Sequence, residues 1–350
     1  MKRFWTTVFL ALIVVGGSWI LLNQDLIEQA GGLRPFLAKH SRSTQYRSTA
    51  TRSDQYSAEP TGPFRSASTP RRIPTNTLPH QETVFGQQLG PARIRVASFK
   101  LSGTTSEQPD QALVLGVVAN ICLKHDVIAF QEVDGHKPGW LDELTSEISR
   151  QSGGQALFRH ASDHVRVARN DPRFAFVYNS ATLELEVQQA YTVADPDNVL
   201  LREPLVGWFR TRLVHPNEAF TFTLANLQLD PEHPGNEIAL LGNLYDAIRR
   251  DGRGEDDVIF VGDFKSGDRA LNKTRQRYGM TWVVSDQATN TMQDAQFDNI
   301  VFNQIATLEF TGNGGVIDFL KAYNLGFRDA MSISDQMPVW AEFSASEKTH

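Results

Sequence analysis

Residues 257–266 read Asp-Val-Ile-Phe-Val-Gly-Asp-Phe-Lys-Ser. Val258 to Val261 are β-branched or aromatic and include no polar residue, which is typical of a strand buried on both faces, and Gly262 ends the run. Asp263 therefore follows at the end of a core strand. An isolated Asp after Gly is most often a turn residue. A functional interpretation needs other strands to end in the same way.

Other predicted strands do carry polar residues at one end. Polar side chains that come from distant parts of a chain and gather at strand ends are typical of a site built on a rigid sheet. The strands and their polar residues are 93–99 with Lys100, 126–130 with Gln131 and Glu132, 220–227 with Gln228, and 297–302 with Asp298, while Ser334-Asp335-Gln336 precedes the strand 337–343.

Helix and strand patterns alternate along the chain from about Pro91. This order favours an α+β fold in which two sheets pack face to face and are covered by helices. Besides the strands given above and 257–261, strands are predicted at 173–178, 183–191, 205–213 and 281–284, helices at 109–123, 138–151 and 236–250, and a helix or loop at 269–278.

Several motifs resemble, in their order, the endonuclease/exonuclease/phosphatase superfamily and its deoxyribonuclease I-like branch. The resemblance covers about residues 93–343 and implies that family's four-layer α/β/β/α sandwich. Arg173 to Tyr178 matches a family strand, although Pro172 replaces the glutamate expected before it. The other motifs are Gln131-Glu132-Val133, Arg202-Glu203-Pro204, Asn226-Leu227-Gln228, Gly262-Asp263-Phe264-Lys265, Phe297-Asp298-Asn299-Ile300-Val301, Asp318-Phe319-Leu320-Lys321-Ala322-Tyr323 and Ser334-Asp335-Gln336-Met337-Pro338-Val339.

The resemblance also implies a catalytic pattern, from which this chain departs. Family members hydrolyse phosphoesters with a divalent cation, usually Mg²⁺, held by an Asn, a Glu and an Asp, and two His handle protons. Four carboxylates remain here, at Glu132, Asp263, Asp298 and Asp335, whereas Lys100 and Lys265 replace Asn, and Gln228 and Gln336 replace His.

These replacements argue against hydrolysis. Glutamine does not take up and return a proton near neutral pH, and an ammonium group has no lone pair to offer a metal. We therefore expect no cofactor; an active enzyme would need Mg²⁺ or Mn²⁺ at Glu132 and Asp335. The two lysines carry the charge of one Mg²⁺, so we predict that Lys100 pairs with Glu132 and Asp335, and that Lys265 pairs with Asp263 and Asp298.

Three classes of function remain open. The first is a degenerate family member that binds a phosphate-containing ligand or a partner in the former cleft, with Arg173, Arg202 and Asn226 as binding residues. The second is an active phosphodiesterase or endonuclease whose acid/base chemistry has moved, for instance to His136 or His233. The third is a tethered structural or interaction protein without a ligand. Metal-dependent turnover separates the second class from the others.

Charge bears on nucleic acid as a partner. Residues 1–90 hold 10 basic and 5 acidic residues, which leaves 24 basic and 35 acidic residues and a formal charge of −11 for the rest of the chain. Such a domain repels a polyanion over its general surface, so nucleic acid binding stays an open question. The single cysteine, Cys122, excludes an internal disulfide.

The first 90 residues predict an export and tethering segment. Lys2 and Arg3 precede an uncharged run from Phe4 to Leu22, about long enough to span a hydrocarbon core of ~30 Å. We expect a signal anchor at 1–23 and a flexible Ser/Thr/Arg/Pro-rich tether at 24–90, followed by the folded domain at 91–345. The domain is then extracytoplasmic, membrane-anchored or, if the segment is cleaved, secreted.

Overall fold

The computed structural model describes the folded domain with four internal gaps. The predicted anchor and tether lie outside the described residues. Within the part of the chain that is described, no helix is long and apolar enough to cross a membrane. The described residues are 92–102, 111–133, 139–162, 174–186 and 190–348.

Two mixed sheets form the centre of the domain. The first sheet has the strand order β12 (Phe310–Val316), β13 (Val339–Ser344), β1 (Arg93–Lys100), β2 (Val127–Gln131), β4 (Ala175–Asn179) and β3 (Phe158–Ser162). The second has the order β10 (Met280–Trp282), β11 (Asp298–Asn303), β9 (Val258–Asp263), β8 (Thr221–Gln228), β7 (Leu205–Thr211) and β5 (Leu183–Leu185), with β6 (Tyr191–Thr192) beside β7.

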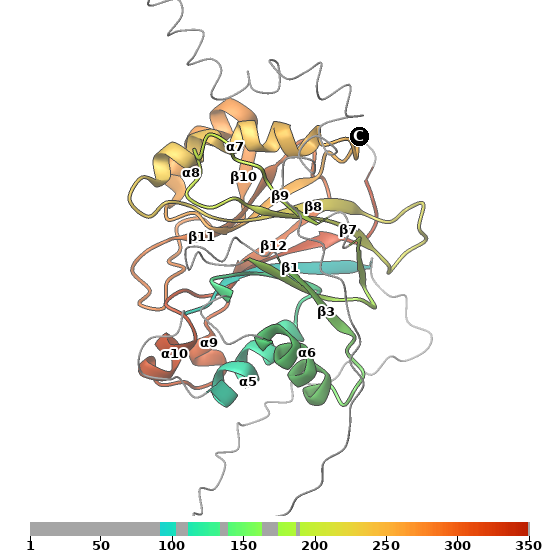
Figure 1. Ribbon diagram of the computed structural model, residues 1–350, viewed down its shortest axis with the longest axis vertical. Helices are drawn as coiled ribbons and strands as arrows, with labels where there is room; N and C mark the ends of the chain where they lie inside the picture. Colours follow the sequence, from blue (N-terminus) through green and yellow to red (C-terminus); the bar gives the residue numbers. More distant parts are fainter. Residues whose placement is uncertain (1–91, 103–110, 134–138, 163–173, 187–189, 349–350) are drawn as a thin grey trace, which may run out of the picture. The chain divides into compact units, whose positions relative to one another are not determined.

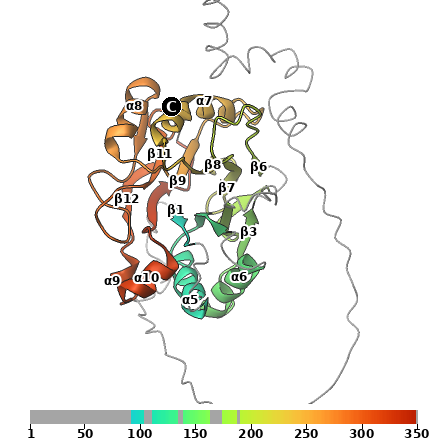
Figure 2. The same cartoon turned by 60° about the vertical axis from the view of Figure 1, so that its left-hand side comes forward.

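Helices cover the outer face of each sheet, as Figures 1 and 2 show. The first sheet is covered by α5 (Gln111–Cys122), α6 (Trp140–Gln151), α9 (Phe319–Ala322) and α10 (Phe327–Ile333). The second is covered by α7 (Pro234–Arg249) and α8 (Asp268–Tyr278). A third apolar cluster fills the space between the sheets. This mixed α/β arrangement agrees with the predicted order of helices and strands.

The continuous apolar strands follow from burial on both faces. In β9, Ile259 and Val261 pack between the sheets, whereas Val258 and Phe260 pack under the helices of the second sheet. Alternate residues of a strand point to opposite faces, so each face needs its own apolar set. The strand therefore lacks the polar alternation of a half-exposed strand.

Three strand predictions need correction. β3 was missed because it is an edge strand with few buried residues. β12 was missed because its sequence contains three glycines; a Cβ on Gly314 would lie 2.6 Å from the carbonyl oxygen of Trp340 in β13, so the close approach requires glycine there. The predicted strand 183–191 is two short strands, β5 and β6, which pair with different parts of β7.

Candidate functional site

The polar strand ends meet at one edge of the sheets. In the first sheet, β1 and β2 are parallel and place Lys100 opposite Gln131. In the second, β8 and β9 are parallel and place Gln228 opposite Asp263, while antiparallel β11 begins with Asp298, also opposite Asp263. Parallel strands end at the same edge, so the sheet topology itself gathers these residues.

Hydrogen bonds then join the two sheets at this edge. Gln228 Nε2 donates to Glu132 Oε1 at 2.7 Å, and Gln336 Nε2 donates to Asp263 Oδ2 at 2.9 Å. The resemblance assigns histidine to the positions of both glutamines. Their amide NH₂ groups hold the two carboxylates in place. The side-chain carbonyl oxygen of each glutamine is buried and has no hydrogen-bond partner among the described residues.

Lys100 forms the ion pairs predicted for it. Its Nζ lies 2.8 Å from Asp335 Oδ1 and 3.6 Å from Glu132 Oε1, and its side chain is 8% exposed. Burial alone would lower the pKa of Lys100, but Glu132 and Asp335 outweigh it and raise that pKa. Ser334 Oγ donates to the Lys100 carbonyl at 2.6 Å and fixes the backbone. The Lys100 ammonium is therefore charged, and its two ion pairs fix its position in the cluster.

Of the two ion pairs predicted for Lys265, only the one with Asp263 forms. It follows β9 with a left-handed φ of 51°, and its Nζ lies 2.6 Å from Asp263 Oδ2 and 5.4 Å from the centre of the Phe297 ring. No ion pair joins it to Asp298, so that predicted pair is wrong. Both carboxyl oxygens of Asp298 are buried without a hydrogen-bond partner, and burial raises the pKa of Asp298 well above its usual range.

This arrangement does not fit a divalent cation. A hard cation needs several oxygen lone pairs free to point at one centre. Here the Lys100 ammonium lies between Glu132 and Asp335, the two carboxylates that the resemblance assigns to the metal. The Gln228 amide already occupies one oxygen of Glu132. The positive charge beside Glu132 and Asp335 is supplied by the Lys100 side chain.

Asn226, which the sequence analysis gives as a binding residue, lies buried inside the sandwich. It is 0% exposed; Nδ2 donates to the Phe130 carbonyl at 2.9 Å, and Oδ1 accepts from Gln131 Nε2 at 2.7 Å. The side chain therefore bridges the two sheets and leaves no obvious group for a phosphate. Sequence reasoning missed this bridge because the register between two sheets is not readable from either strand.

Asn226→Ala is expected to lower the free energy of unfolding by about 1–2 kcal/mol, because it leaves buried donor and acceptor groups of the other sheet unpaired. Urea unfolding of wild type and variant checks this. Asn217→Ala, at an exposed turn residue, serves as the control and should change stability little. An unchanged midpoint for Asn226→Ala would contradict the bridge.

Arg202 is not brought into the cluster. Arg173 and His136 lie outside the described residues. Arg202 is half-buried before β7, and within the described part of the chain its Nε and Nη1 have no hydrogen-bond partner. Its charged neighbour is Glu237 at the start of α7, a carboxyl whose pKa burial raises and Arg202 partly lowers. No contact in the described residues joins Arg202 to Lys100 or Lys265.

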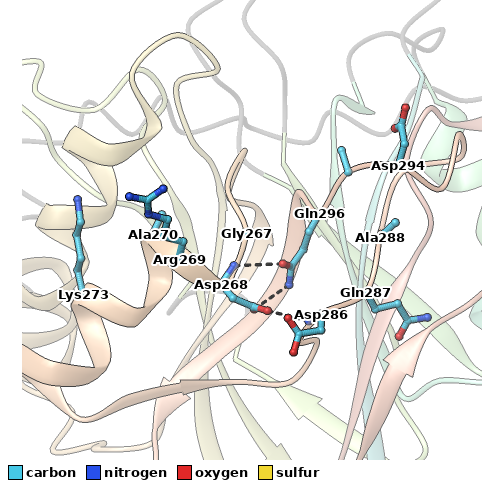
Figure 3. A pocket seen from close by; sticks show the side chains of 11 residues that line it. Gly267, Asp268, Arg269, Ala270, Lys273, Asp286, Gln287, Ala288, Asp294 and Gln296 are labelled. Atoms are coloured by element: carbon cyan, nitrogen blue, oxygen red, sulfur yellow. Dashed lines mark hydrogen bonds between the residues drawn. The ribbon is translucent and has the colours of Figure 1, made fainter.

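A polar pocket of about 730 Å³ begins two residues beyond Lys265. Figure 3 shows Arg269 and Lys273 of α8 on one side of it and Asp294 and Gln296 on the other. Gln296 bonds the backbone and the carboxylate of Asp268 at 3.2 and 3.1 Å. Neither Arg269 nor Lys273 forms an ion pair within the described residues. No motif in the sequence had indicated this pocket.

Comparison with known proteins identifies relatives along most of the domain. The chain is similar to deoxyribonuclease gamma of Rattus norvegicus, with 25% identity over 273 residues, 73% of this chain and 86% of the relative. It is 26% identical over 275 residues to deoxyribonuclease-1-like 1 of Bos taurus, 75% of this chain and 84% of the relative. No protein-family model matches the chain.

Among solved structures, an endonuclease/exonuclease/phosphatase family protein from Bacteroides thetaiotaomicron superimposes with a TM-score of 0.49 and 12% identity, over 73% of this chain and 98% of the other. The assignment rests on the sequence relatives and on the order of the motifs. On both grounds, the chain resembles the deoxyribonuclease I-like branch of the endonuclease/exonuclease/phosphatase superfamily.

Proposed function

We propose that this domain is a deoxyribonuclease I-like protein that no longer hydrolyses phosphodiesters and that binds a phosphate-containing ligand beside the former catalytic cluster. The loss of hydrolysis is supported above all by the position of Lys100 Nζ, which lies 2.8 Å from Asp335 and 3.6 Å from Glu132. A metal ion entering there would have to displace a buried ammonium from both carboxylates.

The second support is the loss of a proton carrier. General acid–base catalysis contributes roughly 10²–10⁴-fold in enzymes that use it. Gln228 and Gln336 stand where the family has histidine, and each donates its amide protons to a carboxylate. Glutamine has no titration near neutral pH, so these two positions cannot activate water or protonate a leaving oxygen.

The proposal that the domain binds a phosphate-containing ligand rests on the pocket beyond Lys265. Arg269 and Lys273 line it without an ion pair in the described residues, and guanidinium and ammonium groups are the common protein donors to phosphate oxygens. Asp268, Asp286 and Asp294 also line it. Three carboxylates beside two basic groups disfavour a long polyanion, so the proposal is restricted to a ligand with one phosphodiester or phosphate.

Two assays test the proposal. Hydrolysis of supercoiled plasmid and of a chromogenic phosphodiester, with Mg²⁺, Mn²⁺ or EDTA, should not exceed the background of Asp263→Ala. Binding of a phosphorothioate-linked dinucleotide should weaken about tenfold, ~1.4 kcal/mol, in Arg269→Ala or Lys273→Ala. Arg150→Ala, on the exposed side of α6, should bind as wild type does. Equal binding by all variants would refute the pocket.

A second candidate, an active enzyme with relocated chemistry, is favoured by one observation. His233 Nδ1 lies 3.4 Å from Asp230 Oδ2 in the loop after β8, and the imidazole side chain is 65% exposed. A histidine oriented by a carboxylate is a usual general base. Metal-dependent cleavage that disappears in His233→Ala and in Asp263→Ala would favour this candidate over the first.

We also propose that residues 1–23 anchor the protein in a membrane, with the domain on the extracytoplasmic side and residues 24–90 as its tether. The support is the uncharged run from Phe4 to Leu22 behind Lys2 and Arg3. The full-length chain should stay with membranes after alkaline extraction, whereas a chain lacking residues 1–23 should not. Release of both chains would refute the anchor.

A further inference from the structure

Three carboxylates converge at the end of the sandwich opposite the candidate site. Asp257 directly precedes β9, whose other end is Asp263; Glu309 precedes β12, and Glu347 follows β13. One oxygen from each lies within 4.8 Å of the others. Asp257 is 2% exposed and Glu309 0% exposed, while Glu347 is open to solvent. The three come from separate segments and meet only in the fold.

Burial of such a group is costly unless something compensates it. Burial, with Glu309 and Glu255 nearby, raises the pKa of Asp257 to about 9, and burial also raises the pKa of Glu347 to about 7. Asp257 Oδ1 is buried and accepts no hydrogen bond. Lys348 gives the group one hydrogen bond, from its backbone N–H to Glu309 Oε1 at 2.7 Å, whereas its Nζ bonds the Leu308 carbonyl at 2.7 Å.

A neutral side chain adds an independent observation. Thr307 is 3% exposed, its hydroxyl faces the carboxylate of Asp257, and its Oγ1 makes no well-formed hydrogen bond. A buried hydroxyl is normally satisfied. Together with the carboxylates it makes an oxygen-only donor set, which is the set that hard cations prefer over transition metals.

We propose that Asp257, Glu309, Glu347 and the Thr307 hydroxyl form a binding site for a hard divalent cation of the Ca²⁺ class. Ca²⁺ takes about six to eight oxygen ligands in flexible geometry, so water reaching the exposed Glu347 completes its shell. The bound cation ties the start of β9, the segment before β12 and the chain after β13 together. This site is separate from the candidate functional site and does not depend on the proposed function.

Thermal unfolding of the full-length chain in EDTA and in about 5 mM Ca²⁺ tests the proposal. A saturated site should raise the unfolding midpoint by about 3 °C or more. Glu347→Gln keeps an acceptor for the Thr221 amide, which now bonds Glu347 at 3.2 Å, and Thr307→Val keeps the shape. Both should fold in EDTA with a wild-type midpoint and lose more than half of the Ca²⁺ shift.

Two controls separate this site from others. Glu232→Gln changes an exposed carboxylate outside the cluster and should keep the full shift, as should Glu132→Gln in the candidate site. A Ca²⁺ shift that is absent in wild type, or equal in Glu347→Gln, Thr307→Val and wild type, overturns the proposal. Loss of the shift in Glu132→Gln alone would assign the cation to the other end of the domain and equally overturn it.

Terbium luminescence gives a second, local readout. Trp208 Nε1 donates to Glu255 Oε2 at 3.0 Å, and Glu255 Oε1 accepts from the Asp257 amide at 3.0 Å, so the indole lies beside the cluster. Excitation of tryptophan should sensitise bound Tb³⁺, and Ca²⁺ should displace the signal. Trp208→Phe should remove most of the emission while keeping the Ca²⁺ thermal shift. Emission that persists unchanged in Glu347→Gln would contradict the site.

Discussion

Lys100→Asn is expected to destabilise the domain by about 2–4 kcal/mol in the absence of metal. The substitution leaves Glu132 and Asp335 close together without the ammonium that now lies 3.6 and 2.8 Å from them. Removing one partner of a buried pair costs about 3–5 kcal/mol. We lower that range because the Asp335 side chain is 48% exposed. Denaturant unfolding in EDTA measures the change.

The same variant should become responsive to metal. Asparagine restores an oxygen donor beside Glu132 and Asp335, so Mg²⁺ or Mn²⁺ should recover part of the lost stability, in addition to any effect of cations on the wild type. Lys321→Asn is the matched control: it breaks an ion pair with Asp318 whose lysine is 80% exposed and should cost about 0–1 kcal/mol. If both variants unfold alike and neither responds to metal, Lys100 does not hold the cluster.

Restoring the family's residues at four positions should create metal-dependent hydrolysis. The variant combines Lys100→Asn, Gln228→His, Lys265→Asn and Gln336→His. It supplies a metal ligand and two proton carriers, so we expect its rate on a chromogenic phosphodiester to exceed wild type by about 100-fold or more. Pro172, outside the described residues, still replaces an orienting glutamate, so full family activity is not expected.

The rate of this variant should vanish with EDTA and with the further change Asp263→Ala. Circular dichroism establishes whether it folds, and Mn²⁺ binding establishes whether the metal site has formed. A folded, Mn²⁺-binding variant that remains as inactive as wild type would show that these four substitutions are not what prevents hydrolysis.

The sequence predicted which residues gather at the site better than it predicted which of their side chains pair with one another. Polar residues after apolar runs, at Lys100, Glu132, Gln228 and Asp263, were sufficient to predict one shared edge, because parallel strands end together. The ion pairs of Lys100 followed from its charge and from the resemblance, which places Lys100 beside Glu132 and Asp335. The predicted pair of Lys265 with Asp298 does not form, and the Lys265 ammonium pairs with Asp263 alone among the described residues.

Features that depend on sheet-to-sheet geometry were not predictable. Predicting the hydrogen bond between Asn226 and Gln131 requires knowing how the strands of one sheet are aligned with those of the other. Predicting the cluster at Asp257 requires knowing that three separate chain segments converge. β12 escaped prediction for a related reason. Its Gly314 is explained by the nearness of the β13 backbone, which single-strand patterns do not encode.

The most direct test of the account is a crystal structure of the protein grown with Mn²⁺, with anomalous scattering measured at the manganese edge. The account predicts no anomalous peak between Glu132 and Asp335, and the Lys100 ammonium within about 4 Å of both carboxylates. A peak ligated by Glu132 and Asp335, with Lys100 turned away from them, would contradict it and return the domain to the metal-dependent members of its family.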